Sequence, residues 1–383
     1  MSLNKIKIVH VQVTPIFAGA VKFSYDILSN LDKDKYELYV IYSANEPISQ
    51  VLRQEFISKF EDQGIKAIGS KYLRRSIGFH DIAVFFELYH IINNIKPKII
   101  NSISSKPWVL CSILSLLIPK TRFIHTIQGL SWHLGDSFIK RKIYHAVEWL
   151  SSLANDKVVF VNRLYMQYYK YFKNKSIYIP NCLEFKNQGL RTEKGNVSEV
   201  KLLFIGRIDP QKDILTLLKA FNLVIKKSLP FKLYLDIVGD DTIGGGLELI
   251  KAQDFIKENP ALEKLIKFHG WHSDVTPFLE KADIFISTSV YEGFGIVFLE
   301  AGNYYLPVIS TDVDGIPEVV AHNLGGFLAP KHDYRQIANY IEILSSDKNL
   351  RLKMGNDHGQ YVRKHFSKDL IVTQYDNLYT SLS

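Results

Sequence analysis

Short runs rich in β-branched and aromatic residues alternate with longer amphipathic stretches along most of the 383-residue chain, and this alternation restricts the fold more than any other feature. Because parallel strands need long crossover connections, the alternation predicts βα units and parallel sheets, and it excludes an all-β or coiled-coil organisation. A polar, glycine-containing segment, Glu184 to Glu199, interrupts the series and is interpreted as a linker. The sequence therefore predicts two successive doubly wound α/β domains.

Hydrophobic periodicity places the individual elements. Before the linker we expect strands at Ile6–Val13, Leu38–Tyr42, Lys66–Gly69, Ile99–Ile103, Phe123–Ile127, Val158–Val161 and Ser176–Ile179. After the linker we expect strands at Lys201–Ile205, Phe231–Val238, Ile266–His269, Ile284–Ser287 and Val308–Ser310. Beyond Pro330 only helices are expected, at Tyr334–Ser345, Leu350–His365 and Lys368–Leu382. A further helix, Phe79 to Asn94, is expected to turn one apolar face inward, formed by Ile82, Phe85, Phe86, Tyr89 and Ile92.

Composition narrows the class of protein. Apolar residues make up 46% of the chain, enough to bury an ample core. Cys111 and Cys182 lie far apart without a CxxC pair, which argues against a disulfide framework or a zinc site and favours a reducing cytoplasm. The lysine-containing amino terminus is interpreted as a first strand, and the longest uncharged apolar run, Trp108 to Pro119, is shorter than the ~20 residues of a membrane-spanning helix.

Charge is spread unevenly along the chain. Up to Leu183 there are 24 Lys and Arg against 13 Asp and Glu, a net of +11, and the remainder has 23 against 26, a net of −3. A basic first half suggests an anionic partner, such as a phospholipid surface or a phosphate-bearing molecule. A lysine-rich surface kept for solubility is the alternative.

The stretch SVYEGFGIVFLEA, from Ser289 to Ala301, places Glu292 and Glu300 eight positions apart around a Gly-Phe-Gly turn. It follows an expected strand and opens an apolar helical run, so Gly293 and Gly295 let the backbone approach a ligand and helix amides face it. Eight helical residues rise about 12 Å, too far for two acids to flank one glycosidic bond. One extended ligand with hydroxyls at both ends and phosphate between them, a nucleotide sugar, fits this spacing; an ordinary turn with solvated glutamates is the alternative.

Two cations follow the first strand after the linker. Arg207 comes just past that strand and Lys212 at the start of the next helix, so both are expected at the same edge as the Glu292 turn. An Arg fork and a Lys point charge can stabilise the negative charge of a departing diphosphate. In the first half, Gly19 lies at a strand-to-helix turn where bare backbone can approach phosphate, although any tight βα turn can use a glycine.

Taken together, these motifs resemble the family 4 retaining glycosyltransferases of GT-B fold, over nearly the whole chain. The matching set is Gly19, Gly206-Arg207 with Lys212, IVGDD at Ile237–Asp241, EGFG at Glu292–Gly295 with Glu300, and LPVISTDVDGIPEVV at Leu306–Val320. The resemblance implies an acceptor domain, 1–183 with the last helix 367–383 crossing back to it, and a donor domain, 184–366, facing each other across a cleft. It also implies that Glu292 contacts the donor sugar and Glu300 the ribose, that Arg207 and Lys212 bind the diphosphate, and that Phe294 to Ile296 offer backbone amides.

The chain departs from the family pattern at several positions. Ala18-Gly19 stands where many relatives have Gly-Gly, Tyr304-Tyr305 replaces small residues, and Gln128 stands where a histidine often contacts the donor sugar. Gln128 can still position a sugar but cannot titrate. His125, three residues earlier, is expected to be a hydrogen-bonded core residue.

Asp312-Val313-Asp314 spells the DxD pattern of another glycosyltransferase fold. Because Arg207 and Lys212 already supply positive charge for the diphosphate, we expect no metal there, nor at Asp240 and Asp241, and no other cofactor.

The expected reaction is transfer of a sugar from a nucleotide-diphosphate donor to a hydroxyl of a saccharide, with anomeric configuration retained. We expect the acceptor to be lipid-linked, in cell-surface polysaccharide assembly, and the protein to lie in the cytoplasm or at the inner face of its membrane. Basic and aromatic residues interleave at Lys71–Arg75 and at Tyr165–Lys175, which suits a lipid headgroup zone, although the tyrosines of the second stretch can equally be core.

Rival functions are a nucleotide-sugar epimerase, a catalytically idle sugar-nucleotide-binding subunit, and a nucleic-acid binder, for which no recognition motif is present. The sequence does not specify the donor's sugar or base, the acceptor, the linkage or the oligomeric state.

Overall fold

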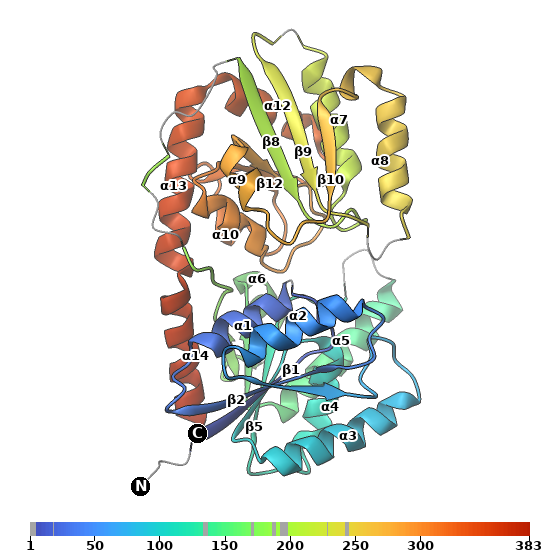
Figure 1. The fold of residues 1–383 in the computed structure, drawn as a ribbon, viewed down its shortest axis with the longest axis vertical. Coiled ribbons are helices and arrows are strands. Elements are labelled where there is room, and N and C mark those ends of the chain that lie inside the picture. Colours follow the sequence, from blue (N-terminus) through green and yellow to red (C-terminus); the bar gives the residue numbers. More distant parts are fainter. Residues whose placement is uncertain are drawn as a thin grey trace. The chain divides into compact units, whose positions relative to one another are not determined.

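The computed structural model describes residues 5–17, 19–132, 137–169, 172–185, 189–191, 198–227, 229–241 and 245–383 (Figure 1). The chain divides into two compact units, one formed by Met1–Cys182 with Lys368–Ser383 and the other by Leu183–Ser367. Each unit contains one parallel sheet with helices packed against it. Parts of the linker, 186–188 and 192–197, lie outside the described residues.

The first unit is built on a seven-stranded parallel sheet in the order β3-β2-β1-β4-β5-β6-β7. Its strands are β1 (Ile6–Val11), β2 (Tyr36–Ser43), β3 (Lys66–Ser70), β4 (Ile99–Ser102), β5 (Arg122–Ile127), β6 (Lys157–Phe160) and β7 (Ser176–Tyr178). Its helices are α1 (Ala20–Asn30), α2 (Gln50–Glu61), α3 (His80–Ile95), α4 (Ser105–Ser115), α5 (Phe138–Ala154), α6 (Arg163–Tyr168) and α14 (Lys368–Leu382). The strand order reverses between β1 and β4, the position at which ligands bind in doubly wound sheets.

The two faces of this sheet are covered by different helices. Buried residues of α1, α2 and α14 form one cluster with the sheet, and those of α3 and α4 form another. Helix α14, at the far end of the sequence, inserts Tyr375 and Tyr379 fully into the first cluster. The hydroxyl of Tyr379 is 2.8 Å from His10 Nε2 on β1, which confirms that the last helix packs on the first unit.

The second unit has a six-stranded parallel sheet in the order β10-β9-β8-β11-β12-β13. Its strands are β8 (Glu199–Ile205), β9 (Lys232–Val238), β10 (Ile266–Gly270), β11 (Ile284–Ile286), β12 (Val308–Thr311) and β13 (Gly326–Ala329). Its helices are α7 (Ile214–Ile225), α8 (Leu247–Lys257), the 3₁₀ turn η2 (Pro260–Leu262), α9 (Thr276–Lys281), α10 (Ile296–Asn303), α11 (Ile316–Val320), α12 (Tyr334–Ser346) and α13 (Lys348–Phe366). The strand order reverses between β8 and β11.

The structure departs from the sequence predictions at one strand and at one helix face. Strand β13 is not predicted, because four residues beginning with glycine give almost no strand signal. On α3, the buried residues are Val84, Leu88, Ile92 and Ile95, so Ile82 and Phe86 of the predicted inward face are exposed.

The described residues of the aromatic stretch Tyr165–Lys175 do not form a surface that could contact lipid. Tyr165, Tyr169 and Phe172 are buried in a cluster with Trp108 and Phe160, which is the alternative that the sequence left open. Lys170 and Tyr171 lie outside the described residues. Within the described ranges, no helix combines the length and apolarity that crossing a bilayer requires.

Buried histidines predict a pH-dependent stability. Burial lowers the pKa of His10 and of His125 in the first unit to about 3, and that of His358 in the second to about 4. Below pH ~6.5 the unfolded chain therefore binds protons that the folded chain does not, so the free energy of unfolding falls as pH falls. Each histidine changes the free energy of unfolding by about 1.4 kcal/mol per pH unit in that range.

Calorimetry is expected to show unfolding midpoints that drop from pH 7 to pH 5, before carboxylates of ordinary pKa titrate. His125→Gln, as a control, should weaken the dependence; midpoints independent of pH over this range would contradict it.

Candidate active site

Two loops of the second unit meet because their strands are neighbours where the strand order reverses. Strands β8 and β11 pair in parallel, with Leu202 opposite Ile284 and Leu203 opposite Phe285. The loop after Ile205 and the loop after Ile286 consequently leave the same carboxyl edge of the sheet. Ligands of doubly wound sheets bind at this edge, and both predicted cation and carboxylate motifs are on these loops.

The structure brings Lys212 and Glu292 into contact. Lys212 Nζ donates to Glu292 Oε2, and their side chains have exposed fractions of only 13% and 14%. The Thr288 hydroxyl lies 2.9 Å from the carbonyl oxygens of both Lys212 and Asp213, so it ties the two loops together. Shielding from water strengthens the attraction between the two charges and makes it costly to leave either of them unpaired, and the pair places one positive and one negative group at the same point.

Asp213 fixes the position of Lys212 from the other side. It is the amino-terminal cap of α7 in a left-handed conformation, φ 45°, and its side chain accepts hydrogen bonds from the amide and hydroxyl of Thr216. His332 Nδ1 lies 2.7 Å from its Oδ2. The lysine therefore projects from a backbone whose direction is set by a capped helix start.

The Glu292 turn is held by the loop after β12. Asp314 Oδ2 accepts a hydrogen bond from the amide of Glu292 at 2.9 Å, and the amide of Gly315 donates to the carbonyl of Glu292 at 3.1 Å. Asp314 thus has a structural role on this turn that sequence reasoning missed, because the DxD pattern was weighed only as a metal site. Among the described residues, no group of three His, Cys, Asp or Glu side chains is arranged to hold a metal ion.

The residues from Gly293 to Ile296 form the start of α10. Gly295 has φ 79°, and a Cβ built there would lie 2.5 Å from the ring of Phe298, so only glycine fits without a shift. Phe294 is buried against the ring of Phe366, which leaves only its backbone for a ligand. Ile296 is the first residue of α10, and amides of a first helical turn have no partner within the helix and can hold an anion.

Replacing Gly315 by alanine is expected to disturb this turn. A Cβ at position 315 would lie 2.3 Å from the carbonyl oxygen of Gly293, and backbone cannot move aside cheaply. We expect a loss of stability of about 1 to 3 kcal/mol, measured by thermal unfolding. Gly129→Ala, where no atom lies within 4 Å, is the matched control. Equal behaviour of the two variants would contradict the tight approach.

Arg207 lies on the same loop as Lys212, and its side chain is half-exposed. The hydrogen bonds and ion pairs described for it do not include Lys212 or Glu292. Its guanidinium lies 3.0 Å from Asp209 Oδ2 and donates to Gln211 Oε1 at 2.9 Å. Gln211 in turn donates from Nε2 to the carbonyl of Tyr291, next to Glu292. The sequence analysis did not identify Asp209 and Gln211 as partners of Arg207. Their position between Arg207 and Lys212 in the segment GRIDPQK is the only indication that the sequence offers.

Glu300 lies on α10, four residues beyond its start, with a partly buried side chain. Its carbonyl accepts from the amide of Tyr304 at the end of the helix. The structure therefore keeps Glu292 and Glu300 on one continuous turn-and-helix segment.

Gly19 and Gln128 belong to the first unit. Gly19 precedes α1 with φ 44° and has open space where a Cβ would stand, whereas Ala18 lies outside the described residues. Gln128 follows β5 and forms two hydrogen bonds with Asn181. Gln128 Nε2 donates to Asn181 Oδ1 at 3.1 Å, and Asn181 Nδ2 donates to Gln128 Oε1 at 2.9 Å. This reciprocal pair fixes which way the Gln128 amide faces, and Asn181 is a residue for which the sequence gave no signal.

His125 is a core residue, as expected. It is buried, its ring stacks on Trp108 with centroids 4.0 Å apart, and its Nδ1 lies 2.9 Å from the Ser102 hydroxyl. Burial lowers its pKa to about 3, so it stays neutral at physiological pH.

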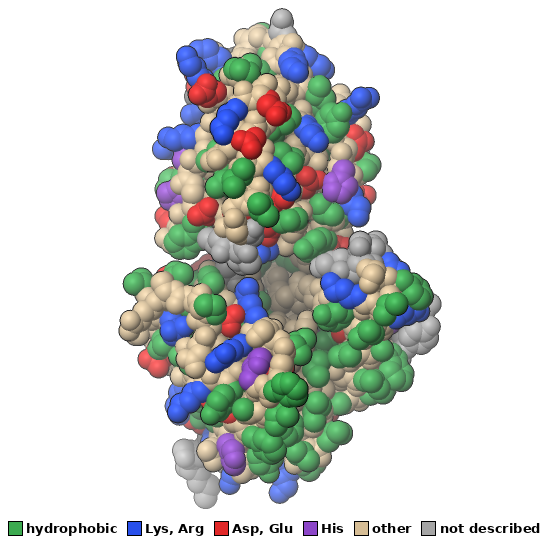
Figure 2. Space-filling view, turned by 90° about the vertical axis from the view of Figure 1, so that its right-hand side faces the viewer, with side chains coloured by type: hydrophobic (Ala, Val, Ile, Leu, Met, Phe, Trp, Pro, Cys, Tyr) green, Lys and Arg blue, Asp and Glu red, His purple; other side chains and the backbone are tan. Residues whose placement is uncertain are grey.

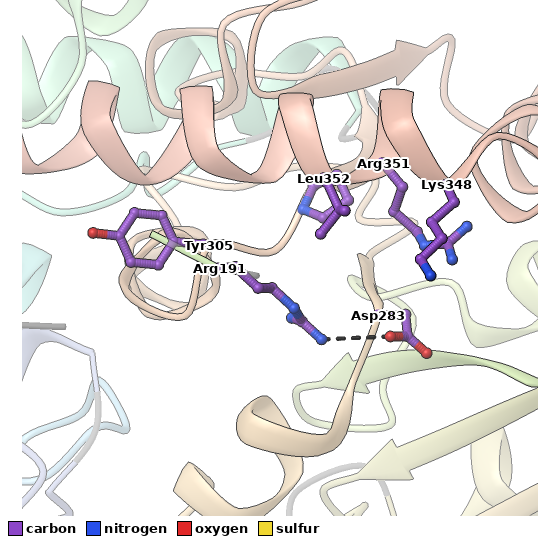
Figure 3. A pocket seen from close by; sticks show the side chains of 7 residues that line it. Arg191, Asp283, Tyr305, Lys348, Arg351 and Leu352 are labelled. Carbon is purple, nitrogen blue, oxygen red and sulfur yellow. Dashed lines mark hydrogen bonds and ion pairs between the residues drawn. The ribbon is translucent and has the colours of Figure 1, made fainter. Parts of the chain in front are cut away.

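A second polar site, at the amino end of β11, is structural. Arg191 and Asp283 form an ion pair beside Lys348 and Arg351 of α13, around a cavity of about 30 Å³ (Figure 3). Arg191 also donates to the carbonyl of Ala282, and its amide donates to Asn356. Because Asp283 precedes β11 and Glu292 follows it, this cluster is at the opposite edge of the sheet from Lys212, and it attaches the linker to the second unit.

The chain is similar to known proteins in sequence and in fold. Residues 188–360 match the family model described as glycosyl transferases group 1. The chain is 25% identical over 382 residues to the UDP-Gal:alpha-D-GlcNAc-diphosphoundecaprenol alpha-1,3-galactosyltransferase of Escherichia coli, covering 94% of this chain and 93% of that protein. It is 27% identical over 326 residues to the capsular polysaccharide biosynthesis glycosyltransferase CapM of Staphylococcus aureus, covering 79% of this chain and 83% of CapM.

A solved structure shows the same fold. The crystal structure of Anabaena Alr3699/HepE in complex with UDP and glucose superposes on this chain with a TM-score of 0.80. The superposition covers 98% of this chain and 100% of that protein, and the two sequences are 16% identical. At this identity the likeness concerns the fold. The family model over residues 188–360 and the full-length relatives together support a group 1 glycosyltransferase, and the structure has the GT-B fold of two Rossmann-like domains.

Proposed function

We propose that this glycosyltransferase moves a sugar from a nucleotide-diphosphate donor to a hydroxyl of a lipid-diphosphate-linked saccharide, in cell-surface polysaccharide assembly. The observation that carries the proposal is the contact between Lys212 and Glu292 beside the start of α10. A cation, a carboxylate and helix amides at one sheet edge match the diphosphate and the hydroxyls of a nucleotide sugar. The Escherichia coli relative, named for a diphosphoundecaprenol acceptor, supports the acceptor class, and CapM supports the polysaccharide context.

Lys212 and Glu292 form an ion pair with each other. When the donor binds, its diphosphate competes for the ammonium group of Lys212, and the Glu292 carboxylate is released to accept hydrogen bonds from sugar hydroxyls. Arg207, half-exposed on the same loop, supplies a second positive group for the phosphates. Glu300 would accept from the ribose diol, and Gly293 to Ile296 would donate backbone amides to the diphosphate.

In the proposed reaction, the bond between the anomeric carbon and the β-phosphate oxygen breaks, and its electron pair stays on the phosphate. The acceptor hydroxyl attacks the anomeric carbon from the same face and passes its proton to the departing phosphate oxygen, so configuration is retained. Lys212, Arg207 and the α10 amides stabilise the growing negative charge. Gly19 and Gln128 of the first unit are proposed to contact phosphate and sugar, and no metal ion is required because the cations fill its role.

The test is a transfer assay with the purified full chain. A panel of UDP- and GDP-sugars is screened by thermal shift, since a selective ligand raises the unfolding midpoint. The sugar that binds is then supplied with an undecaprenyl-diphosphate saccharide, with and without EDTA, and the product anomer is assigned by NMR. We expect transfer that survives EDTA. Selective donor binding without hydrolysis or transfer would favour an idle subunit, and interconversion of nucleotide sugars would favour an epimerase.

A further inference from the structure

The side chains that helix α5 buries are all polar, whereas most of the side chains that it exposes are apolar. The residues it buries are Glu148, Ser151 and Ser152. Glu148 accepts hydrogen bonds from Ser131, Tyr169 and Trp132, the last at 3.0 Å, so its carboxyl group is held inward. A helix packed on a soluble core normally shows the reverse pattern, because water favours the polar side.

The outer side of α5 is almost continuously apolar. Ile139 has an exposed fraction of 71% and Leu150 of 59%. The other exposed apolar residues of this helix are Phe138, Ile143, Val147, Trp149 and Leu153. Leaving so many large apolar side chains in water is costly, and a patch of this kind marks an interaction surface.

The neighbouring helices extend this surface. Helices α4 and α5 are in contact, and so are α3 and α4. Helix α4 and the two residues that follow Ser115 expose Ile113, Leu116 and Leu117, and α3 with its preceding loop exposes Ile77, Phe79, Ile82 and Phe86. Hydrophobic side chains gather over this part of the first unit in Figure 2. We call the exposed apolar residues of α3, α4 and α5 the outer face.

The charges of this part of the chain are mostly positive. From Lys71 to Ala154 the sequence contains 11 Lys and Arg but only 4 Asp and Glu. Of the three described acids, Asp81 pairs with Lys106, Glu87 accepts from the Ser70 hydroxyl and the Lys71 amide, and Glu148 is buried. Lys140 and Lys142, in the first turn of α5, are exposed beside Phe138 and Ile139.

We propose that the outer face docks on an anionic phospholipid bilayer, with α5 lying along the headgroup zone. An apolar stripe with Trp and Phe, next to lysines and with no exposed acid among the described residues of this segment, has the composition of an interfacial helix. Anionic headgroups match the lysines and arginines, whereas a second copy of the chain would bring the same positive charges together. The inference deepens the proposed function and rests on it only for the acceptor's location, because docking itself needs neither donor nor acceptor.

The experiment is flotation of the full chain with vesicles that contain no substrate. Vesicles of phosphatidylcholine are compared with vesicles holding about 30 mol % phosphatidylglycerol, at about 0.05 and 0.5 M NaCl. We expect binding to the anionic vesicles that falls at least about ten-fold in Ile139→Asp with Leu150→Asp, and that falls with salt in the parent protein. Lys140→Gln with Lys142→Gln should reduce binding to anionic vesicles more than to neutral ones.

A matched control tests whether position matters. Leu247 and Ile250 on α8 of the second unit have exposed fractions of 62% and 51%, similar to those of the α5 pair. Leu247→Asp with Ile250→Asp should bind vesicles as the parent does. No binding of the parent at low salt, or equal binding of the two double variants, would overturn the proposal. Concentration-dependent dimers that disappear in the α5 variant, without vesicle binding, would overturn it in favour of self-association.

Trp149 gives a direct readout of insertion. It is exposed on the outer face, whereas Trp108 and Trp132 are buried and Trp271 is in the second unit. Brominated lipid in anionic vesicles is expected to quench the parent protein and to leave Trp149→Phe almost unquenched. Quenching that persists in Trp149→Phe would place another surface on the lipid. A failed transfer assay leaves these binding results unaffected, and absent binding leaves transfer to a detergent-dispersed acceptor unaffected.

Discussion

Replacing Lys212 by methionine is expected to lower kcat for sugar transfer by about 10² to 10³-fold, the effect of removing one preorganised donor to a developing negative charge. The side chain keeps its length but cannot neutralise the departing diphosphate. The loop should stay in place, because Thr288 holds its backbone carbonyl and Asp213 caps the following helix. Initial rates at saturating donor measure the loss, and the unfolding midpoint shows whether the fold is kept.

Lys227 provides the matched control. It pairs with Glu342 on the surface of the same unit, where its side chain has an exposed fraction of 55%. Lys227→Met removes an ammonium group from an ion pair just as Lys212→Met does, but away from the sheet edge. We expect its kcat to match the parent. A Lys212→Met enzyme as fast as Lys227→Met would show that this lysine does not face the donor.

Replacing Glu292 by glutamine is expected to lower kcat/KM by about 10 to 10²-fold, the worth of hydrogen bonds to a charged acceptor. The amide has the same shape and still meets Lys212, but it accepts more weakly from sugar hydroxyls and presents two donors in place of a carboxylate oxygen. The fold should persist, since Glu292 is tied to Asp314 and Gly315 through its backbone. Steady-state kinetics with varied donor gives the loss.

The two substitutions are expected to be non-additive. Lys212 and Glu292 contact each other, so each single change also leaves the partner unpaired in a largely shielded place. Lys212→Met with Glu292→Gln should therefore be less damaging than the product of the two single losses. Glu342→Gln is the matched control for Glu292→Gln and should retain full activity. Strict additivity would indicate that the pair is not formed in the working enzyme.

Much of the site follows from the order of strands along the chain. In a doubly wound sheet the loops after the first and fourth strands meet, so Lys212 after β8 and Glu292 after β11 can be expected at one edge before any coordinates exist. The contribution of Asp314 cannot be read in this way. Its carboxylate reaches the Glu292 amide from a third loop, and a short loop's path depends on left-handed residues such as Asp314 itself, φ 43°.

Helices α3 and α5 show a different limit of sequence reasoning. Hydrophobic periodicity identifies an apolar stripe along a helix, but it does not show whether that stripe or another face of the helix packs against the sheet. On α3 the inward stripe contains Val84 and Leu88, and the aromatic Phe86 is outside. On α5 a buried glutamate is satisfied by Ser131, Trp132 and Tyr169, contacts that form only in the folded chain. A rule that places apolar residues inward therefore gives the wrong side for Phe86 of α3 and for the exposed apolar residues of α5.

The position of α14 has a consequence for biosynthesis. His10 and Tyr379 touch across a separation of 369 residues, and the hydrophobic cluster of the first sheet includes Ile371 and Tyr375. A ribosome that has finished the first 182 residues has therefore not yet delivered the helix that closes this core, whereas residues 183–367 emerge as an uninterrupted unit. The amino-terminal domain can therefore complete this cluster only after residues 368–382 have been synthesised, whereas the domain of residues 183–367 is built from one continuous segment.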